Sequence, residues 1–447
     1  MYRYRWIVRE MTDLHFYFRR GRRSVLIFLA TASLLIAGGW AGVARAQPSA
    51  PTVRIDLERA IRLALEHNHA LLAARTQVTQ SKANEVTASL RPNPVFTWNG
   101  LFWPFFSPSQ LNRDYIDNAT EFDALFSYTF ERGHKRRWRT QTARDVTAVI
   151  QSQVQDSERA LTFNVAQQFV SVLLAESSLA FARQNLASFR QTLDVSEERY
   201  KKGAISEGDF LKIKLQMLQF QKDVASAQLA REQALDSLRD LLGYGSVPQN
   251  YDVAGKLDYT PIQGNVEDYQ SRALNLRPDL HAATQAVVAA KSGYMLARAN
   301  GKRDLTLTSG YSHVGYANDA SFSVNMEIPL FDRNQGEIAR SHAAITQSEE
   351  DKRATQQAVM TDVSTSYEAV KTGGRIIQLY QSGYLKESKE SLDISRYAYQ
   401  RGAASLLDFL DAERSYRSTE VTYRETLATY MLAVEQLREA VGTRQLP

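Results

Sequence analysis

The residues best suited to chemistry in this sequence are carboxylates in a motif that occurs twice. Residues 200–211 read YKKGAISEGDFL and residues 399–410 read YQRGAASLLDFL, so each Gly is followed six residues later by Asp209 or Asp408. Exposed carboxylates attract cations. An Asp in the first turn of a helix also has a purely structural role, because it interacts favourably with the helix dipole.

The second copy of the motif carries one more carboxylate than the dipole explains. Asp411 lies three residues after Asp408, so both side chains share one face of a helix. Gly203 and Gly402 are expected to form the tip turns that end one helix before the next begins. A Ser three residues after each Gly is suited to cap the following helix. Each motif is therefore interpreted as the tip of a helical hairpin.

Histidine, the other side chain suited to metal binding, is scattered along the chain. His67 and His69 lie about 200° apart around a helix, so they cannot share a metal ion there. A selective site needs clustered imidazole and carboxylate ligands. We therefore expect no resident metal ion and no cofactor. The histidines after residue 46 are His67, His69, His134, His281, His313 and His342.

Composition and motifs also argue against an enzyme. The sequence contains no Cys, which excludes disulfides, thiol nucleophiles, thiolate metal sites and a lipidated N-terminal Cys. The nucleophile elbow Gly-x-Ser-x-Gly, the Walker A loop and the zinc motif His-Glu-x-x-His do not occur. We interpret the chain as a protein without catalytic activity.

The first 46 residues differ sharply from the rest. They hold eight of the 54 basic and two of the 49 acidic side chains, so the formal charge of +5 arises there. The remaining 46 basic and 47 acidic side chains nearly cancel, which gives no footprint for nucleic acid. A basic cluster at 19–23, an apolar stretch at 24–37 and Ala44-Arg45-Ala46 are typical of a signal peptide.

Residues 1–46 are therefore predicted to be a signal peptide that is cleaved after Ala46. A transmembrane anchor is the alternative, which the shortness of the apolar run and its end at Gly38-Gly39 disfavour. Beyond residue 46 no apolar run approaches the roughly 20 residues that a spanning helix needs. We expect an exported protein that does not cross a membrane by helices.

The elements that position the two motifs belong to a duplicated unit. Residues 57–243 and 266–442 align at an offset near 200, and the stretch between them is rich in Gly and Pro. We expect a first repeat at 47–243, a connector at 244–265 and a second repeat at 266–447. Within each repeat the expected order is helix, two strands, long helix, helix.

The long helices are unusual for a globular domain. Between Gly133 and Gly203 lie 69 residues without Gly or Pro, which as a helix would measure roughly 100 Å. Such a length indicates a coiled coil or an assembly. The matching run of the second repeat contains Gly373-Gly374 and Gly383, where we expect a kink or a break.

Four segments alternate between apolar and polar residues with the period of a strand, at about 95–106, 120–131, 304–316 and 320–331. In the last, Phe322, Val324 and Met326 alternate with Ser323, Asn325 and Glu327. Each has about the length of a tilted membrane strand. A half-buried sheet of a soluble domain is the alternative. The export signal and the lack of any other core to cover the aromatic strands favour a membrane sheet.

Four strands cannot close a barrel, and open edges are not tolerated in lipid. Several subunits are therefore expected to pool their strands. The long helices are expected to pack side by side in a ring below the barrel.

Several short stretches complete this pattern: Leu57-Glu58-Arg59-Ala60, Ala64-Leu65-Glu66-His67-Asn68, Pro92-Asn93-Pro94, Ile328-Pro329-Leu330-Phe331-Asp332 and the two tips. Together with the features above, they resemble the TolC family of outer-membrane efflux proteins, over about residues 56–443. The resemblance implies a mostly helical protein with a membrane sheet, found in the Gram-negative outer membrane and extending into the periplasm. It implies a homotrimer with a twelve-stranded barrel and a helical tunnel. It also implies two partners, a periplasmic adaptor (membrane fusion protein) and an inner-membrane RND transporter.

Within the family, residues 130–136 resemble the aliphatic-Glu-x-Gly-Gly-Lys-Arg stretch of the CzcC-like branch, with His134 in place of the second Gly. This implies heavy-metal cations as the exported cargo. Three alternatives stay open: efflux of drugs or other small molecules, type I secretion, and a structural coiled-coil protein of the envelope.

The resemblance also assigns roles at the tips. Asp408 and Asp411 match two rings of carboxylates that line the periplasmic gate. Asp209 and Tyr399 match a pair that latches the hairpins together. Ala404 stands where the family has an Arg partner of this latch. The gate is therefore expected to be bonded differently here.

Overall fold

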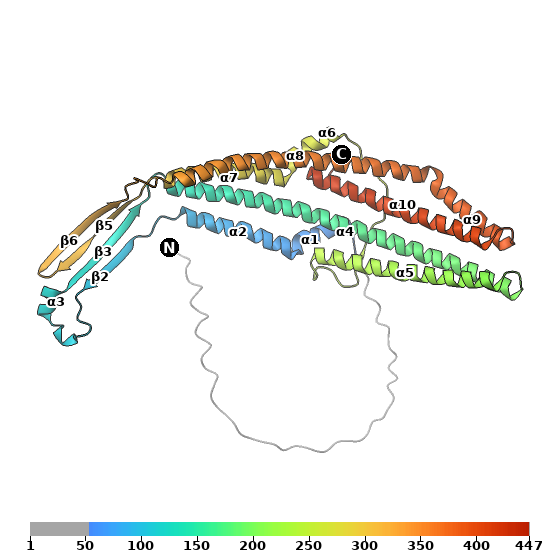
Figure 1. The fold of residues 1–447 in the computed structure, drawn as a ribbon, viewed down its shortest axis with the longest axis horizontal. Helices are drawn as coiled ribbons and strands as arrows, with labels where there is room; N and C mark the ends of the chain where they lie inside the picture. The colour runs from blue at the N-terminus through green and yellow to red at the C-terminus, as the bar shows by residue number, and fades with distance from the viewer. Residues whose placement is uncertain (1–52, 447) are drawn as a thin grey trace, which may run out of the picture. The chain divides into compact units, whose positions relative to one another are not determined.

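The computed structural model describes residues 53–446. The predicted signal peptide lies outside the described residues. The described chain is mostly helical, with one four-stranded sheet and a small two-stranded one (Figure 1). Its elements are β1 (Arg54–Ile55), α1 (Leu57–His67), α2 (His69–Ser89), β2 (Val95–Leu101), η1 (Pro108–Gln110), α3 (Arg113–Ala119), β3 (Glu121–Phe130), α4 (Lys135–Lys201), α5 (Glu207–Leu242), β4 (Asp252–Val253), α6 (Val266–Leu276), α7 (Pro278–Asn300), β5 (Leu305–Val314), β6 (Ala317–Met326), α8 (Gln335–Leu379), η2 (Tyr380–Tyr384), α9 (Leu385–Arg401) and α10 (Leu406–Val441).

The longest element is α4, a helix of 67 residues. It follows Gly133 and His134, which both have positive φ and turn the chain out of strand β3. At about 1.5 Å per residue it spans roughly 100 Å. Since α4 begins beside the sheet and ends at Lys201, two residues before Gly203, it holds the first tip far from the strands (Figure 1).

The second repeat divides its long helix differently from the first. The break falls at η2, a π-helical turn in which Gly383 has a φ of 152°. The expected break at Gly373-Gly374 is wrong, because α8 runs straight through both residues. A Cβ at position 374 would lie 3.2 Å from the Tyr259 hydroxyl, and one at 373 would lie 3.4 Å from Tyr430. These two glycines allow close packing and do not bend the helix.

The four-stranded sheet is antiparallel, in the order β2-β3-β5-β6. Two strands are shorter than expected. β2 ends at Leu101 because Phe102 takes a positive φ and Pro104 follows. β6 begins earlier and ends at Met326, three residues before Pro329, which has no N–H to donate to a ladder. In the described chain, β2 and β6 are the open edges of this sheet.

The pairing register separates the sheet into two faces of opposite character. On one face, hydroxyl and carboxylate side chains bond across strands: Ser127 to Thr308 at 2.9 Å and Asp123 to Ser312 at 2.6 Å. The residues of the other face, here called the apolar face, include Phe96, Trp98, Phe122, Phe126, Tyr128, Leu305, Leu307, Tyr311, Phe322, Val324 and Met326.

Three apolar clusters hold the helices together. One joins α1, α4 and α5 to strands β1 and β4, and a second joins α6, α8 and α10. The third lies between the two hairpins, α4–α5 and α9–α10, near their tips. It consists of Phe189, Ile213, Met217, Phe220, Leu392, Tyr399, Leu406 and Phe409.

Among residues 53–446, one helix, α4, contains a stretch that is long and apolar enough to cross a membrane. Several apolar side chains of this part of α4, including Leu161, Val165, Phe169 and Val172, are buried in the first cluster. The apolar character of this stretch is that of a core helix.

Candidate functional site

The two tips share one internal design. At each tip the Gly takes a left-handed conformation, with φ of 73° at Gly203 and 77° at Gly402. In each, the motif Tyr stacks on the motif Phe across the turn: Tyr200 on Phe210 at 5.0 Å, and Tyr399 on Phe409 at 5.4 Å. The repeated Tyr, Gly and Phe thus build the turn itself, and this accounts for most of the repeated motif.

Asp408 caps the helix that follows the second tip. Its carboxylate accepts hydrogen bonds from the Ser405 backbone N–H at 3.1 Å and from the Ser405 hydroxyl at 2.7 Å. These two bonds hold the pKa of Asp408 below its usual range. Asp408 therefore has a structural role as the partner of Ser405 in a capping box, in addition to the dipole interaction expected from the sequence. Because the side chain is also exposed, its carboxylate can still interact with cations from solution.

Asp411 has no such local role. It is exposed, and its nearest cation is Arg414 one turn further along α10, at 3.5 Å. Asp408 and Asp411 both belong to helix α10, so residues three apart lie on one face of a helix there, as the sequence predicted.

Asp209 and Tyr399 are not hydrogen bonded to each other in the single chain. Asp209 pairs with Lys212 at 3.5 Å, and its backbone N–H bonds the Ser206 hydroxyl at 3.1 Å. Tyr399 is buried, and its hydroxyl has no hydrogen-bond partner within residues 53–446. The latch that the resemblance assigns to this pair stays a prediction.

Arg199 is a tip residue that sequence reasoning missed. Its Nη1 donates to the backbone carbonyl of Tyr399 at 2.8 Å, and its guanidinium lies 5.1 Å from the centre of the Tyr399 ring. It thereby ties the end of α4 to the end of α9. One feature of the sequence could have pointed to Arg199: the equivalent position of the second repeat is Ala398, so the two repeats differ there.

A second polar tie lies further along the hairpins. Arg417 of α10 forms a short ion pair with Asp223 of α5. Its guanidinium also lies 4.6 Å from the centre of the Phe220 ring. Arg199 and Arg417 thus both cross from one hairpin to the other, on either side of the third apolar cluster.

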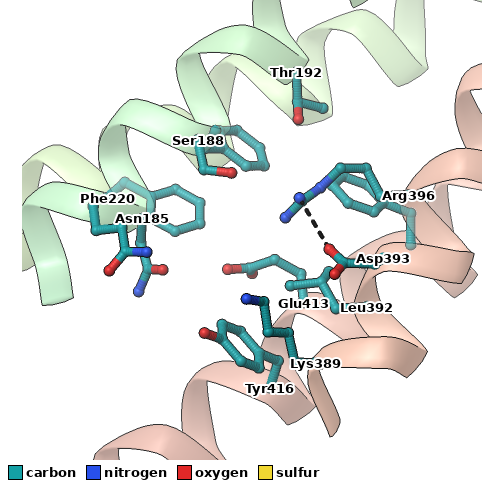
Figure 2. A pocket seen from close by; sticks show the side chains of 13 residues that line it. Asn185, Ser188, Thr192, Phe220, Lys389, Leu392, Asp393, Arg396, Glu413 and Tyr416 are labelled. Atoms are coloured by element: carbon teal, nitrogen blue, oxygen red, sulfur yellow. Dashed lines mark hydrogen bonds and ion pairs between the residues drawn. The ribbon is translucent and has the colours of Figure 1, made fainter. Parts of the chain in front are cut away.

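A polar cavity of about 90 Å³ lies between the hairpins beside this cluster (Figure 2). Asn185, Ser188 and Thr192 line it from α4, and Lys389, Asp393 and Arg396 line it from α9. Asp393 and Arg396 form an ion pair at 3.4 Å.

Glu413 of α10 enters the same cavity and is only 6% exposed. Its nearest cation is the Nε of Arg417 at 3.7 Å, which is beyond hydrogen-bonding distance. Burial raises the pKa of Glu413 to about 7, against a weaker opposing effect of Arg417 and Arg396. A carboxyl group that titrates near neutral pH therefore sits where the hairpins meet.

The described residues do not offer a resident metal site. Among residues 53–446, no three or more His, Asp or Glu side chains gather so that they could hold an ion. The six histidines stay apart. His313, for example, bonds Asn318 and the carbonyl of Ile116.

An open sheet with one apolar face, joined to helical hairpins far longer than a globular domain allows, defines a subunit of an outer-membrane channel. Residues 60–244 and 270–443 match the family described as outer membrane efflux protein, and the chain belongs to this family. The TolC-like fold, the outer-membrane location and the role of an efflux duct without enzymatic activity are thereby confirmed.

Individual relatives agree with this assignment. The chain is 23% identical over 383 residues to the cobalt-zinc-cadmium resistance protein CzcC of Cupriavidus metallidurans, covering 85% of this chain and 88% of that relative. It is 28% identical over 282 residues to the cation efflux system protein CusC of Escherichia coli K12, covering 59% of each. A crystal structure of CusC matches with a TM-score of 0.72 at 24% identity, covering 88% of this chain and 94% of that one. That structural likeness shows the fold alone.

Proposed function

We propose that this protein is the exit duct of a tripartite system that exports heavy-metal cations, working with a periplasmic adaptor and an inner-membrane RND transporter. The proposal of heavy-metal cargo rests on the similarity to the cobalt-zinc-cadmium resistance protein along most of both chains. The similarity to a cation efflux system protein supports the same class of cargo.

The stretch 130–136, which suggested a heavy-metal branch, has a structural role. Glu131 binds Arg139 at 2.6 Å, and Lys135 binds Asp304 at 2.8 Å. Both ion pairs brace the junction between the sheet and the helices. This stretch therefore supports kinship with the branch and does not itself select a cation.

The functional unit is proposed to be a homotrimer. The sheet leaves β2 and β6 unpaired, and backbone groups at an open edge cannot be satisfied in lipid. Pairing β6 of one copy with β2 of the next satisfies both edges. Three copies give twelve strands, enough to enclose an aqueous lumen.

The helical tips are proposed to be the periplasmic gate, with Asp408 and Asp411 facing its axis. Rings of exposed carboxylates retain counter-cations, which favours the passage of cations. Opening must part the two hairpins of each subunit, so the contacts of Arg199 and Arg417 oppose it. Asp209 and Tyr399 are proposed to latch the two hairpins together in the assembled gate.

Resistance and accumulation assays test the cargo. The gene is expressed with the pump and adaptor of a metal-exporting RND system, in a Gram-negative strain lacking its own efflux ducts. We expect lower cellular cobalt, zinc or cadmium and higher tolerance to them, and neither with a pump that cannot transport. Restored drug tolerance or protein secretion without any change in metal content would favour the alternatives. A protein that salt or carbonate extracts from membranes would instead indicate a structural envelope protein.

A further inference from the structure

The connection between β2 and β3, residues 102–120, folds back over the sheet on one particular side. A Cβ at Gly100 would lie 2.6 Å from Trp103 Nε1, and Trp103 packs against Trp98 with ring centroids 6.4 Å apart. Gly100 is paired with Phe122, and both positions belong to the apolar face. The first turn of the connection therefore lies against the apolar face, away from the polar one.

The second half of the connection lies on the same side. His313 stacks on Phe122 at 4.9 Å within the apolar face. Its Nε2 lies 3.1 Å from the carbonyl oxygen of Ile116, in helix α3. Tyr115 of α3 donates to the carbonyl of Phe102 at 3.2 Å, which closes the connection on itself. The connection is thus a folded flap at the end of the strands.

The outer surface of this flap is strongly aromatic. Phe102 is 61% exposed, Phe105 is 80% exposed and Phe106 is fully exposed. Nearby Leu111 is also exposed, and the side chain of Arg113 is 96% exposed. Several large apolar side chains beside a charged pair, Arg113 and Asp117 at 3.8 Å, match the chemistry of the boundary between acyl chains and headgroups.

We infer that residues 102–120 anchor the barrel in the outer leaflet of the outer membrane, with Phe105 and Phe106 inserted at the acyl-chain boundary. Lipid is the occupant because the flap continues the apolar face, which is the lipid-facing side of an outer-membrane barrel. A lid over the pore would have to fold toward the polar face. This inference concerns the opposite end of the subunit from the gate and is independent of the cargo.

The absence of Cys from the sequence makes a direct test simple. Single variants Phe105→Cys and Phe106→Cys of the full mature protein are labelled with an environment-sensitive fluorophore. They are reconstituted in phosphatidylcholine vesicles whose acyl chains are brominated near the headgroup. Phe322→Cys, on the apolar face, and Ser323→Cys, on the polar face, are the matched controls. A lipid anchor predicts that bromine lowers the flap signal about twofold or more, as at position 322, with little change at position 323.

Aqueous iodide, a quencher that reaches only labels exposed to water, distinguishes the other possible surroundings of the flap. Quenching of the flap labels by iodide and not by brominated lipid would place the flap in water and overturn the inference. Protection from both quenchers, together with disulfide-linked dimers of the unlabelled Phe106→Cys variant under oxidising conditions, would show that a second copy covers the flap, which also overturns the inference.

Discussion

At the scale of single residues, the tips combine a structural turn with a few cross-hairpin ties. Arg199 provides a tie between the ends of α4 and α9 through a hydrogen bond and a contact with an aromatic ring. In a partly exposed site such contacts contribute about 1–2 kcal/mol per subunit. That is enough to favour the closed arrangement and small enough for a partner protein to overcome.

Replacing Arg199 with Ala should therefore raise the resting conductance of the channel in planar bilayers. Arg190→Ala is the matched control, since Arg190 is an exposed Arg of the same helix, nine residues before Arg199. We expect the control to conduct like the parent. Equal conductance of all three proteins would mean that the tie at Tyr399 does not hold the gate.

Asp411→Asn should lower cation selectivity and weaken block by multivalent cations in the same recordings, because it removes a ring of charge without touching a cap. Asp408→Asn removes the other ring, and its amide oxygen can still accept from Ser405. Asp408→Ala would also lose the cap, at a cost of about 1 kcal/mol. Unchanged selectivity in the double Asn variant would contradict a gate lined by these two residues.

Glu413 should make the packing of the hairpins depend on pH. Its pKa is raised from 4.5 to about 7 in the folded chain, so the packed state holds the proton more tightly than the separated state. Stability should therefore fall as pH rises from 4.5 to about 7, by up to about 3 kcal/mol per subunit.

Thermal unfolding of the solubilised protein at about pH 5 and about pH 8 measures this effect. Glu413→Gln should reduce the difference between the two pH values and be the more stable variant at the higher one. Glu176, whose pKa burial also raises to about 7, should retain part of the difference. Glu390→Gln, a change at an exposed carboxylate of α9, should behave like the parent. A parent protein without pH dependence would show that Glu413 keeps its charge in the packed state.

At the scale of elements, periodicity determined what the sequence could predict. The 69 residues without Gly or Pro predicted α4, and the period-two segments predicted the strands. Contacts between distant segments could not be predicted from periodicity. Nothing in the local sequence shows that Arg199 contacts Tyr399, or that Glu413 is buried. Gly373-Gly374 was misjudged because a Gly in a helix can serve either a bend or a close approach, and only the neighbouring Tyr259 and Tyr430 distinguish them.

Gly374→Leu should accordingly destabilise the protein, because the new side chain collides with Tyr259 and Tyr430. Overpacking of this kind costs about 1–3 kcal/mol. Gly293→Leu in α7 is the control, since a Cβ there meets no atom within 4 Å in the subunit. The melting temperature of each variant is the readout. A loss at position 293 equal to that at 374 would remove the packing explanation.

At the scale of the whole molecule, the duplicated unit gives each subunit four strands, and several subunits together can form a channel. Each copy of the chain contributes one sheet with an apolar and a polar face and two hairpins. A single copy leaves both sheet edges open, so function requires several copies whose polar faces enclose one lumen. The proposed gate, the barrel and the proposed flap anchor would then act at separate places along the same conduit.

The central claim is that the polar face of the sheet lines water while the apolar face meets lipid. Single-Cys variants at each position from Ser321 to Met326, treated with a membrane-impermeant thiol reagent after reconstitution, test it most directly. We expect labelling at 321, 323 and 325 and protection at 322, 324 and 326, in step with the pairing register of β6. Labelling without this two-residue period would contradict the account of the protein as a barrel-forming efflux duct.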